Sequence, residues 1–494
     1  MSYIRYKKVK DREYAYEITA YWDKDKKHSK QRSKYLGIVL DKEAGIFQDV
    51  KRRKRDSDGK VISNPNRQSV QTYKEKEIVS FGSGYLTKKL IDEDDVGKIF
   101  TDLLPLEKLK TLKSLLSYRL INGSAMYLAN DWYEGDISKH LLPGSAMSSQ
   151  ALSIFLRELG DEKLQKDFFR KYLPIATKDS KEGLIVDGSS MPNEINTPIN
   201  EFGYNSGLID KQIKFMSVVS ADNNLPLYFR YSAGSIADIS TLTNTIKELK
   251  AHNTTAKAVL LDAGFYSNDN IKLLQKNKIN FIIRLPSGRK LFKEVINNEK
   301  IDLASNAVKV SKKRVVFIKE KEIKLNNKKT YAYIVLDPKK KADLVNSYLS
   351  EKIDDKQKIN DNEMAKVISQ KGLFVIISTK KQETENILNL YYTRQKVERM
   401  FAFSKSDLNL LPLRVHSEET LRGYLFLLFL LSYFFMKIHQ KLNKEFTVEQ
   451  AFIILSSQKA KIYEKQIFVQ EATKKQKQIF ELFGYDIPEE IARG

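Results

Sequence analysis

Residues 184–190 read LIVDGSS and residues 258–265 read AVLLDAGF, two short apolar runs that each lead into an aspartate. Apolar runs of this length, followed by glycine and small residues, are typical of buried strands. Asp187 and Asp262 are therefore predicted at the carboxyl ends of strands, the edge where mixed sheets build their sites. Oxygen ligands at that edge suit a hard cation such as Mg²⁺. The alternative is that each aspartate only begins a turn.

Further strand and helix patterns surround these two runs. Residues 213–234 have strand character with a turn at 222–224, and the runs NFIIRLP and GLFVIIST indicate two more strands. Helical periodicity over 236–252 and 268–278 separates the later strands. An antiparallel pair beside β-α-β units predicts an α/β protein with a mixed sheet covered by helices.

The regions before and after this sheet have other patterns. Residues 12–40 alternate as a β-hairpin does, and a basic cluster, KRRKR, follows at 51–55. Residues 86–180 have helical periodicity, with Ser148 or Ser149 expected to cap the helical pattern that begins there. Residues 308–337 predict three lysine-rich strands with an Asn-Asn turn, inserted between two halves of the sheet domain.

Composition excludes several classes of function. The net charge of +23 favours a polyanionic partner, with nucleic acid the commonest for a soluble protein. The chain has no cysteine, so disulfides and cysteine-based zinc sites or nucleophiles are excluded. The apolar run at 423–436 is shorter than the roughly 20 residues of a membrane span and predicts a buried helix. Without a signal-peptide pattern or a phosphate-binding loop, we expect a cytoplasmic protein that uses no nucleotide cofactor.

A third carboxylate lies on a predicted helix over residues 383–405. Tyr391, Arg394, Glu398 and Lys405 fall within an arc of about 60° on that helix, so they share one stripe. Apolar residues cover most of the remaining circumference, which predicts a largely buried helix whose ions are paired or bound to a metal. The alternative is an ordinary surface ion pair between Arg394 and Glu398.

These residues carry a family resemblance. The stretch YYTRQKVERMFAFSK contains Tyr-x2-Arg-x3-Glu-x6-Lys and resembles the signature of bacterial insertion-sequence transposases of the IS-four superfamily. Asp187 in IVDGSS and Asp262 in LLDAGF resemble that family's first and second acidic residues. The phrase FIIRLP and the β-rich insertion agree with the same family. Asn224, where relatives often have glycine, and Gly234-Ser235 depart from its pattern without touching the carboxylates.

The resemblance implies a DNA transposase with an RNase H-like catalytic core. Asp187, Asp262 and Glu398 would bind two Mg²⁺ ions, for which Mn²⁺ is expected to substitute, with Asp187 as the bridging ligand. Arg394 and Lys405, and also Tyr391 unless it only packs, would contact DNA phosphates. The partners would be double-stranded DNA, both terminal inverted repeats and target, bound by a homodimer associated with the bacterial nucleoid. No membrane partner is expected.

The patterns and the resemblance together divide the chain into six regions. We expect a β-rich region with a basic linker at 1–80, a helical and DNA-binding region at 81–180 and the first half of the core at 181–286. The β-rich insertion is expected at 287–371, the second half of the core at 372–442 and a helical tail at 443–494.

Two other functions compete with an active transposase. A protein of this fold that only binds DNA would have no use for three buried carboxylates, which cost free energy. A related nuclease would cut DNA without joining the ends. The predicted transposase cleaves the ends of its element and joins their 3′-OH groups to target DNA.

Overall fold

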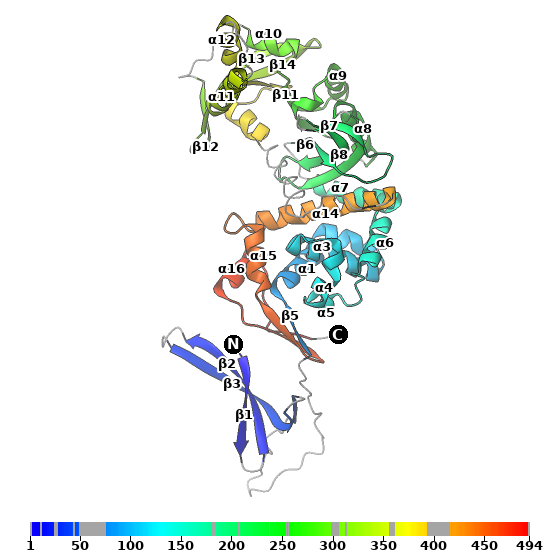
Figure 1. Ribbon diagram of the computed structural model, residues 1–494, viewed down its shortest axis with the longest axis vertical. Helices are drawn as coiled ribbons and strands as arrows, with labels where there is room; N and C mark the ends of the chain where they lie inside the picture. Colours follow the sequence, from blue (N-terminus) through cyan, green and yellow to red (C-terminus); the bar gives the residue numbers. More distant parts are fainter. Residues whose placement is uncertain are drawn as a thin grey trace.

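The computed structural model describes the chain from Ser2 to Ala492 with several gaps. The described residues are 2–9, 12–23, 28–42, 45–48, 76–178, 183–205, 208–236, 238–252, 254, 256–297, 306–311, 314–354, 361–392, 415 and 417–492. Within them the chain forms a small N-terminal sheet, a helical body and a large mixed sheet (Figure 1).

The N-terminal sheet has four antiparallel strands in sequence order, shown in blue in Figure 1. They are β1 (Ser2–Val9), β2 (Arg12–Asp23), β3 (His28–Asp41) and β4 (Ile46–Gln48). The expected hairpin over residues 12–40 is confirmed, because β2 and β3 pair antiparallel from Asp23↔His28 onward. The basic cluster at 51–55 lies outside the described residues.

The helical body occupies residues 82–176, as the periodicity predicts. Ser148 caps α6 by accepting a hydrogen bond from the amide of Ala151 at 3.3 Å, so the capping prediction is confirmed. The elements are α1 (Gly82–Glu93), α2 (Asp95–Leu103), α3 (Leu106–Asn122), η1 (Met126–Leu128), α4 (Ala129–Glu134), α5 (Ser138–Leu141), α6 (Ser149–Leu159) and α7 (Glu162–Ala176).

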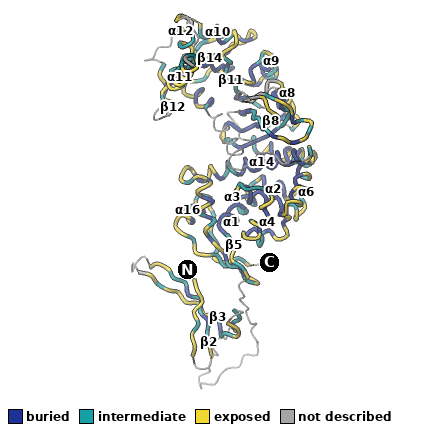
Figure 2. Tube along the Cα trace, in the orientation of Figure 1, coloured by how far each residue is buried: buried dark blue, intermediate teal, exposed yellow. Residues whose placement is uncertain are grey.

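Helix α14 (Glu418–Lys441) runs between the helical body and the large sheet (Figure 1). By length and composition it is apolar enough to cross a membrane, but 83% of its most apolar window is buried inside the protein. Figure 2 shows this burial along the helix. It contacts α6, α3 and β9, and a Cβ on Gly423 would lie 1.7 Å from the carbonyl oxygen of Leu156. The predicted buried helix is thus a core element that joins the two halves.

The large sheet contains ten strands and is mixed, as predicted. Its order is β12-β13-β14-β15-β11-β10-β6-β8-β7, with β9 also paired to β8. The strands are β6 (Leu184–Pro192), β7 (Glu201–Asn205), β8 (Leu208–Ser220), β9 (Pro226–Ala233), β10 (Ala258–Leu261), β11 (Asn280–Leu285), β12 (Ala307–Ser311), β13 (Arg314–Leu325), β14 (Lys328–Leu336) and β15 (Leu373–Ser378).

Parallel pairing is confined to the centre of this sheet. Strand β10 pairs parallel with both β6 and β11, whereas β8 and β9 are antiparallel additions beyond β6. The helices that accompany these strands are α8 (Asp238–Ala251), η2 (Ala263–Phe265), α9 (Asn268–Lys276), α10 (Lys290–Ile296), α11 (Pro338–Asp354), α12 (Asp361–Gln370) and a helical segment at residues 384–392.

The three lysine-rich strands β12, β13 and β14 continue the same sheet through β15. The predicted Asn-Asn turn is present, with Asn326 and Asn327 at φ 51° and 61°, values that asparagine tolerates better than most residues. The charged stretch after these strands, which has no clear periodicity in sequence, forms α11 and α12.

The prediction of a helical tail over residues 443–494 is wrong in part, because this region contains strands as well as helices. Besides α15 (Val448–Ser456) and α16 (Lys474–Phe483) it contains β16 (Lys459–Ile462), β17 (Gln466–Val469) and β18 (Glu490–Ala492). Alternation explains β16, because Ala460 and Ile462 are buried while Lys459 and Lys461 are not. Strand β16 pairs antiparallel with β5 (Glu77–Ser80), which completes a third sheet.

Candidate active site

Asp187 and Asp262 lie side by side on neighbouring parallel strands. The last paired residues of β6 and β10 are Val186 and Leu261, so the two aspartates occupy the next position of the same register. Adjacent strands are about 4.8 Å apart, and in-register residues of a parallel pair face the same side of the sheet. Asp187 is buried and Asp262 is half-buried. Two carboxylates therefore share one face at the centre of the sheet.

The strand ends differ from the prediction at Asp187. Strand β10 ends at Leu261, but β6 continues past Asp187 to Pro192 because it stays paired with β8, where Ser217 is opposite Asp187. Asp187 thus lies at the point where β6 is no longer paired with β10. It does not begin a turn. Asp262 precedes η2, yet its side chain makes no capping hydrogen bond there. Asp187 is therefore not a turn residue, whereas Asp262 begins the turn into η2, where its carbonyl oxygen accepts a hydrogen bond from the Phe265 amide at 3.1 Å.

The same strand register places a cation beside the two aspartates. On β11, Ile283 pairs with Leu261, so Arg284 occupies the position next to Asp262. Ser217, Asp187, Asp262 and Arg284 consequently form one row across four strands. The FIIRLP phrase contains this arginine, but sequence periodicity gives no register, so its place beside the aspartates was missed. Arg284 is a half-buried cation in a row that otherwise holds two acids and a hydroxyl.

Residues 384–392 cross the face that carries this row. The guanidinium Nη1 of Arg284 donates to the Tyr391 hydroxyl at 3.4 Å, and the Tyr391 ring lies 5.6 Å from that of Phe374 on β15. At the start of the segment, the buried Tyr333 accepts a hydrogen bond from the Gln382 amide at 2.6 Å and donates to the Gln382 carbonyl at 2.9 Å. Contacts at both ends thus fix this segment over the sheet.

The predicted site residues are only partly covered by the structure. Asp187, Asp262 and Tyr391 are brought to one face, whereas Arg394, Glu398 and Lys405 lie outside the described residues. Tyr391 is 7% exposed, so burial favours a packing role for its ring. Within the described residues no group of three or more acidic or histidine side chains is placed to hold a metal ion. The two aspartates supply only hard oxygen donors, which fit a divalent cation such as Mg²⁺.

The structure thus combines a mixed sheet, two neighbouring aspartates on one of its faces and a helical segment that crosses this face. This combination defines a class of protein whose acidic centre suits metal-ion chemistry. The profile described as the transposase DDE domain matches residues 178–435, just over half of the chain and the whole of this site. The chain belongs to the DDE transposase family.

Comparison with other proteins gives distant likenesses to solved structures and no curated sequence relative. No curated protein matches the chain by sequence. Among solved structures, the cryo-EM structure of a piggyBac transposase synaptic complex with hairpin DNA is similar with a TM-score of 0.39 and 11% identity, covering 76% of this chain and 79% of that one.

Proposed function

We propose that this transposase cleaves the ends of a bacterial insertion sequence and joins the freed 3′-OH ends to target DNA, using Asp187, Asp262 and Glu398. The observation that carries the proposal is the shared face of Asp187 and Asp262 on parallel strands beneath the segment that leads to Glu398. The Tyr-Arg-Glu-Lys signature supports membership of the IS-four superfamily within the DDE transposases.

We further propose that β6, β8, β9, β10 and β11 form an RNase H-like core. Three antiparallel strands followed by two parallel ones support this assignment, because the aspartates then meet on its central pair. Residues 287–371 are inserted between β11 and β15, which themselves pair antiparallel. The insertion therefore extends the core sheet and leaves the neighbouring strands of the core together.

The third carboxylate follows from helix geometry. Tyr391 and Glu398 are seven residues apart, which places them about 20° apart around an unbroken helix and roughly 10 Å apart along it. Because the Tyr391 hydroxyl meets Arg284 beside Asp262, a helix that continues would direct Glu398 to the same face. Arg394 and Lys405 share this stripe and would hold a DNA phosphate near the carboxylates.

The donor set suits the chemistry of phosphodiester cleavage. Two divalent cations held by Asp187, Asp262 and Glu398, with Asp187 between them, would supply an activated water and stabilise the departing 3′ oxygen. The protein's own part is to hold the carboxylates on a rigid sheet, with Asp187 buried and hydrophobic strands below it. Arg284 lies next to Asp262 in the strand register, where its positive charge would partly balance that of the carboxylates.

The DNA partner and the homodimer are proposed from the composition and the family. A DDE transposase acts on double-stranded DNA, which here would be the terminal inverted repeats and the target. Because the two ends of the element are cleaved by two active sites, we expect a homodimer. The net charge of +23 favours such a polyanionic partner and a place on the bacterial nucleoid in the cytoplasm. We place end recognition in residues 1–180, ahead of the catalytic core.

The experiment uses the full chain and a labelled duplex that carries the terminal repeat of its element. Glu398→Gln and Asp262→Asn are each expected to lower Mg²⁺- or Mn²⁺-dependent cleavage by about 10²-fold or more, with DNA affinity unchanged. Asp222→Asn is the matched control, because the exposed Asp222 lies in the turn between β8 and β9 at the opposite edge of the sheet. Cleavage by Glu398→Gln at the rate of the unmodified chain would overturn the assignment.

The same assay separates the competing functions. A protein that binds the duplex but leaves it intact under every metal condition would be a DNA-binding derivative of a transposase. Transfer of a labelled 3′ end into a plasmid distinguishes a transposase from a nuclease that only cuts. We expect both cleavage and joining, and both should fail together in Asp262→Asn.

A further inference from the structure

One face of the N-terminal sheet has an unusual composition. Because paired residues of an antiparallel sheet face the same side, alternate residues of β1 from Tyr3, of β2 from Arg12 and of β3 from Ser29 to Tyr35 share this face, here called the tyrosine face. Its cations are Arg5, Lys7 and Arg12, all exposed. Among the described residues none at these positions is acidic, so the tyrosine face is positive where β1 and the start of β2 lie and uncharged along the rest of the β2–β3 ribbon.

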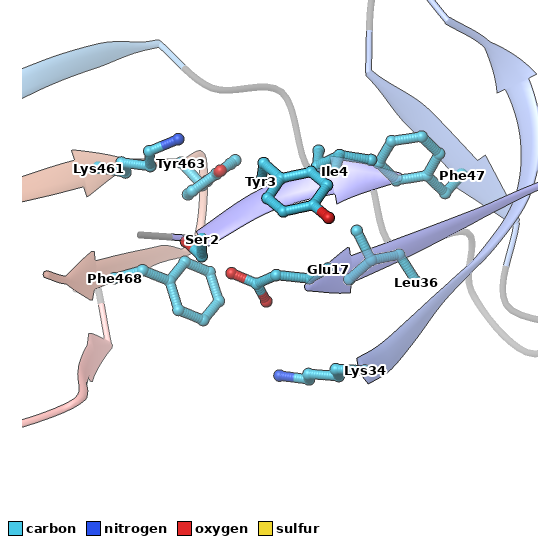
Figure 3. Close-up of a pocket in the computed structure, with 10 residues that line it drawn as sticks. All are labelled: Ser2, Tyr3, Ile4, Glu17, Lys34, Leu36, Phe47, Lys461, Tyr463 and Phe468. Carbon is cyan, nitrogen blue, oxygen red and sulfur yellow. The ribbon is translucent and has the colours of Figure 1, made fainter. Parts of the chain in front are cut away.

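The opposite face carries the acids and is partly covered. Glu13 and Glu17 lie on that side, and Glu13 pairs with Lys42 at 3.0 Å. A small cavity of about 50 Å³ separates this side from the C-terminal sheet (Figure 3). Its lining includes Ile4, Glu17, Lys34 and Phe47 from this side, Tyr3 from β1, and Tyr463 and Phe468 from the C-terminal sheet. The ammonium of Lys34 lies 5.7 Å from the Phe468 ring.

Aromatic and hydrogen-bonding groups complete the tyrosine face. Trp22 is 64% exposed and Tyr35 is 37% exposed, while the rings of Tyr16 and Tyr35 lie 5.3 Å apart. Gln31 and Ser33 are exposed on the same side of β3. A contiguous patch of exposed aromatic rings is a feature of surfaces that bind a partner. Here they stand beside cations and polar groups without any acid.

We propose that the tyrosine face binds double-stranded DNA, with the β2–β3 ribbon against the major groove. The groove admits a two-stranded β-ribbon, and the charge of the face complements the phosphates. Arg5, Lys7 and Arg12 contact the backbone, while Gln31 and Ser33 face the base edges, where glutamine pairs with adenine. This inference rests on the proposed function, because it gives the transposase an end-binding surface separate from Asp187 and Asp262.

The test compares two triple variants of the full chain that remove the same charge. Arg5→Gln, Lys7→Gln and Arg12→Gln change the tyrosine face, whereas Lys8→Gln, Lys30→Gln and Arg32→Gln change the opposite face of the same strands. Affinity for the terminal-repeat duplex is measured across a salt series. We expect the first variant to lower the slope of log K against log salt by about 2–3, since each lost phosphate contact removes roughly 0.9. The second should lower it by less than about 1.

A single substitution tests base recognition. Gln31→Ala is expected to reduce the preference for the terminal repeat over a scrambled duplex by about tenfold, with the salt slope unchanged. Equal losses in both triple variants would mean a general charge effect and would overturn the proposal, as would unchanged binding by the first variant. A change in the self-association of the chain in place of DNA affinity would also contradict it.

If the unmodified chain binds the duplex through the tyrosine face but never cleaves it, the transposition activity fails and the binding surface stands. If the unmodified chain cleaves the duplex and the first triple variant binds as tightly, the binding surface alone fails. Thermal unfolding of each variant confirms that the exposed substitutions leave the fold intact.

Discussion

The guanidinium of Arg284 donates to the hydroxyl of Tyr391 at 3.4 Å, while the Arg284 position directly neighbours that of Asp262. One side chain thus joins the strand beside Asp262 to the segment that leads to Glu398. Its half-buried charge is held over the ring of Phe374, with the guanidinium carbon 5.4 Å from the ring centre. Such a planar cation can bridge two partners in a way that lysine cannot.

Replacing this arginine should affect catalysis more than folding. We expect Arg284→Lys to lower metal-dependent cleavage by about 10- to 100-fold, the usual range for residues that orient metal ligands. The measurement is the single-turnover cleavage rate across a Mg²⁺ titration, where a positioning role also raises the metal concentration needed. Arg289→Ala, on the exposed loop after β11, is the control and should cleave normally.

The Tyr333 hydroxyl should be essential for the placement of residues 384–392. Tyr333→Phe removes both hydrogen bonds to the half-buried Gln382 backbone, and because each contributes about 0.5–1.5 kcal/mol, the loss should be about 1–3 kcal/mol. Urea unfolding measures this loss, and cleavage should fall with it. Tyr331→Phe, on the same strand but half-buried, should change the free energy of unfolding by no more than about 0.5 kcal/mol. Equal stability of the two variants would contradict the role of Tyr333.

The contact between α6 and α14 should not tolerate a larger residue. A Cβ on Gly423 would overlap the carbonyl oxygen of Leu156, and both belong to helix backbones that cannot move aside locally. We therefore expect Gly423→Ala to destabilise the chain by about 1–3 kcal/mol or more. Gly288→Ala, where a Cβ meets no atom within 4 Å, provides the control. A thermal melting curve unchanged by Gly423→Ala would show that the helices can separate without cost.

Asp136 should make stability depend on pH. Burial raises the pKa of this carboxyl from 3.8 to about 7, although Ser138 donates to its Oδ1. Its Oδ2 finds no hydrogen-bond partner among the described residues. The folded chain therefore holds the proton where the unfolded chain has lost it. Its contribution to stability is greatest below the unfolded pKa and is lost as the pH rises towards 7.

The size of this effect follows from linkage. A shift of this size corresponds to a stability loss of up to about 4 kcal/mol between the two pKa values. Asp136→Asn cannot ionise and should remove this slope from the free energy of unfolding measured across that pH range. Parallel pH profiles for the variant and the unmodified chain would show that Asp136 titrates normally.

The sequence predicted those features that depend on local pattern. The apolar runs around Asp187 and Asp262 gave the central strands, the serine before α6 gave its cap, and alternation gave the β2–β3 hairpin. Each of these signals lies within a window of a few residues. The third acidic residue and the two basic residues of its stripe remain predictions, because they lie outside the described residues.

Features that depend on register or on distant pairing were not predictable. The position of Arg284 next to Asp262 is set by the pairing of β10 with β11, and a slip of one residue would turn it to the opposite face. The extension of β6 beyond Asp187 depends on β8, which supplies partners that periodicity does not reveal. The tail was predicted as helical because β16 and β17 are only four residues each and need partners from elsewhere in the chain.

The pairing of β5 with β16 has a consequence for synthesis. Ser80 donates a hydrogen bond to the carbonyl of Ser456, 376 residues later in the chain. A ribosome that adds 5–20 residues per second needs roughly 20–75 s to bridge that interval. During that time the edge of β5 and the neighbouring Phe81 have no C-terminal partner. A chain that ends before β16 lacks this pairing, so it would be less stable and more readily cleaved by proteases.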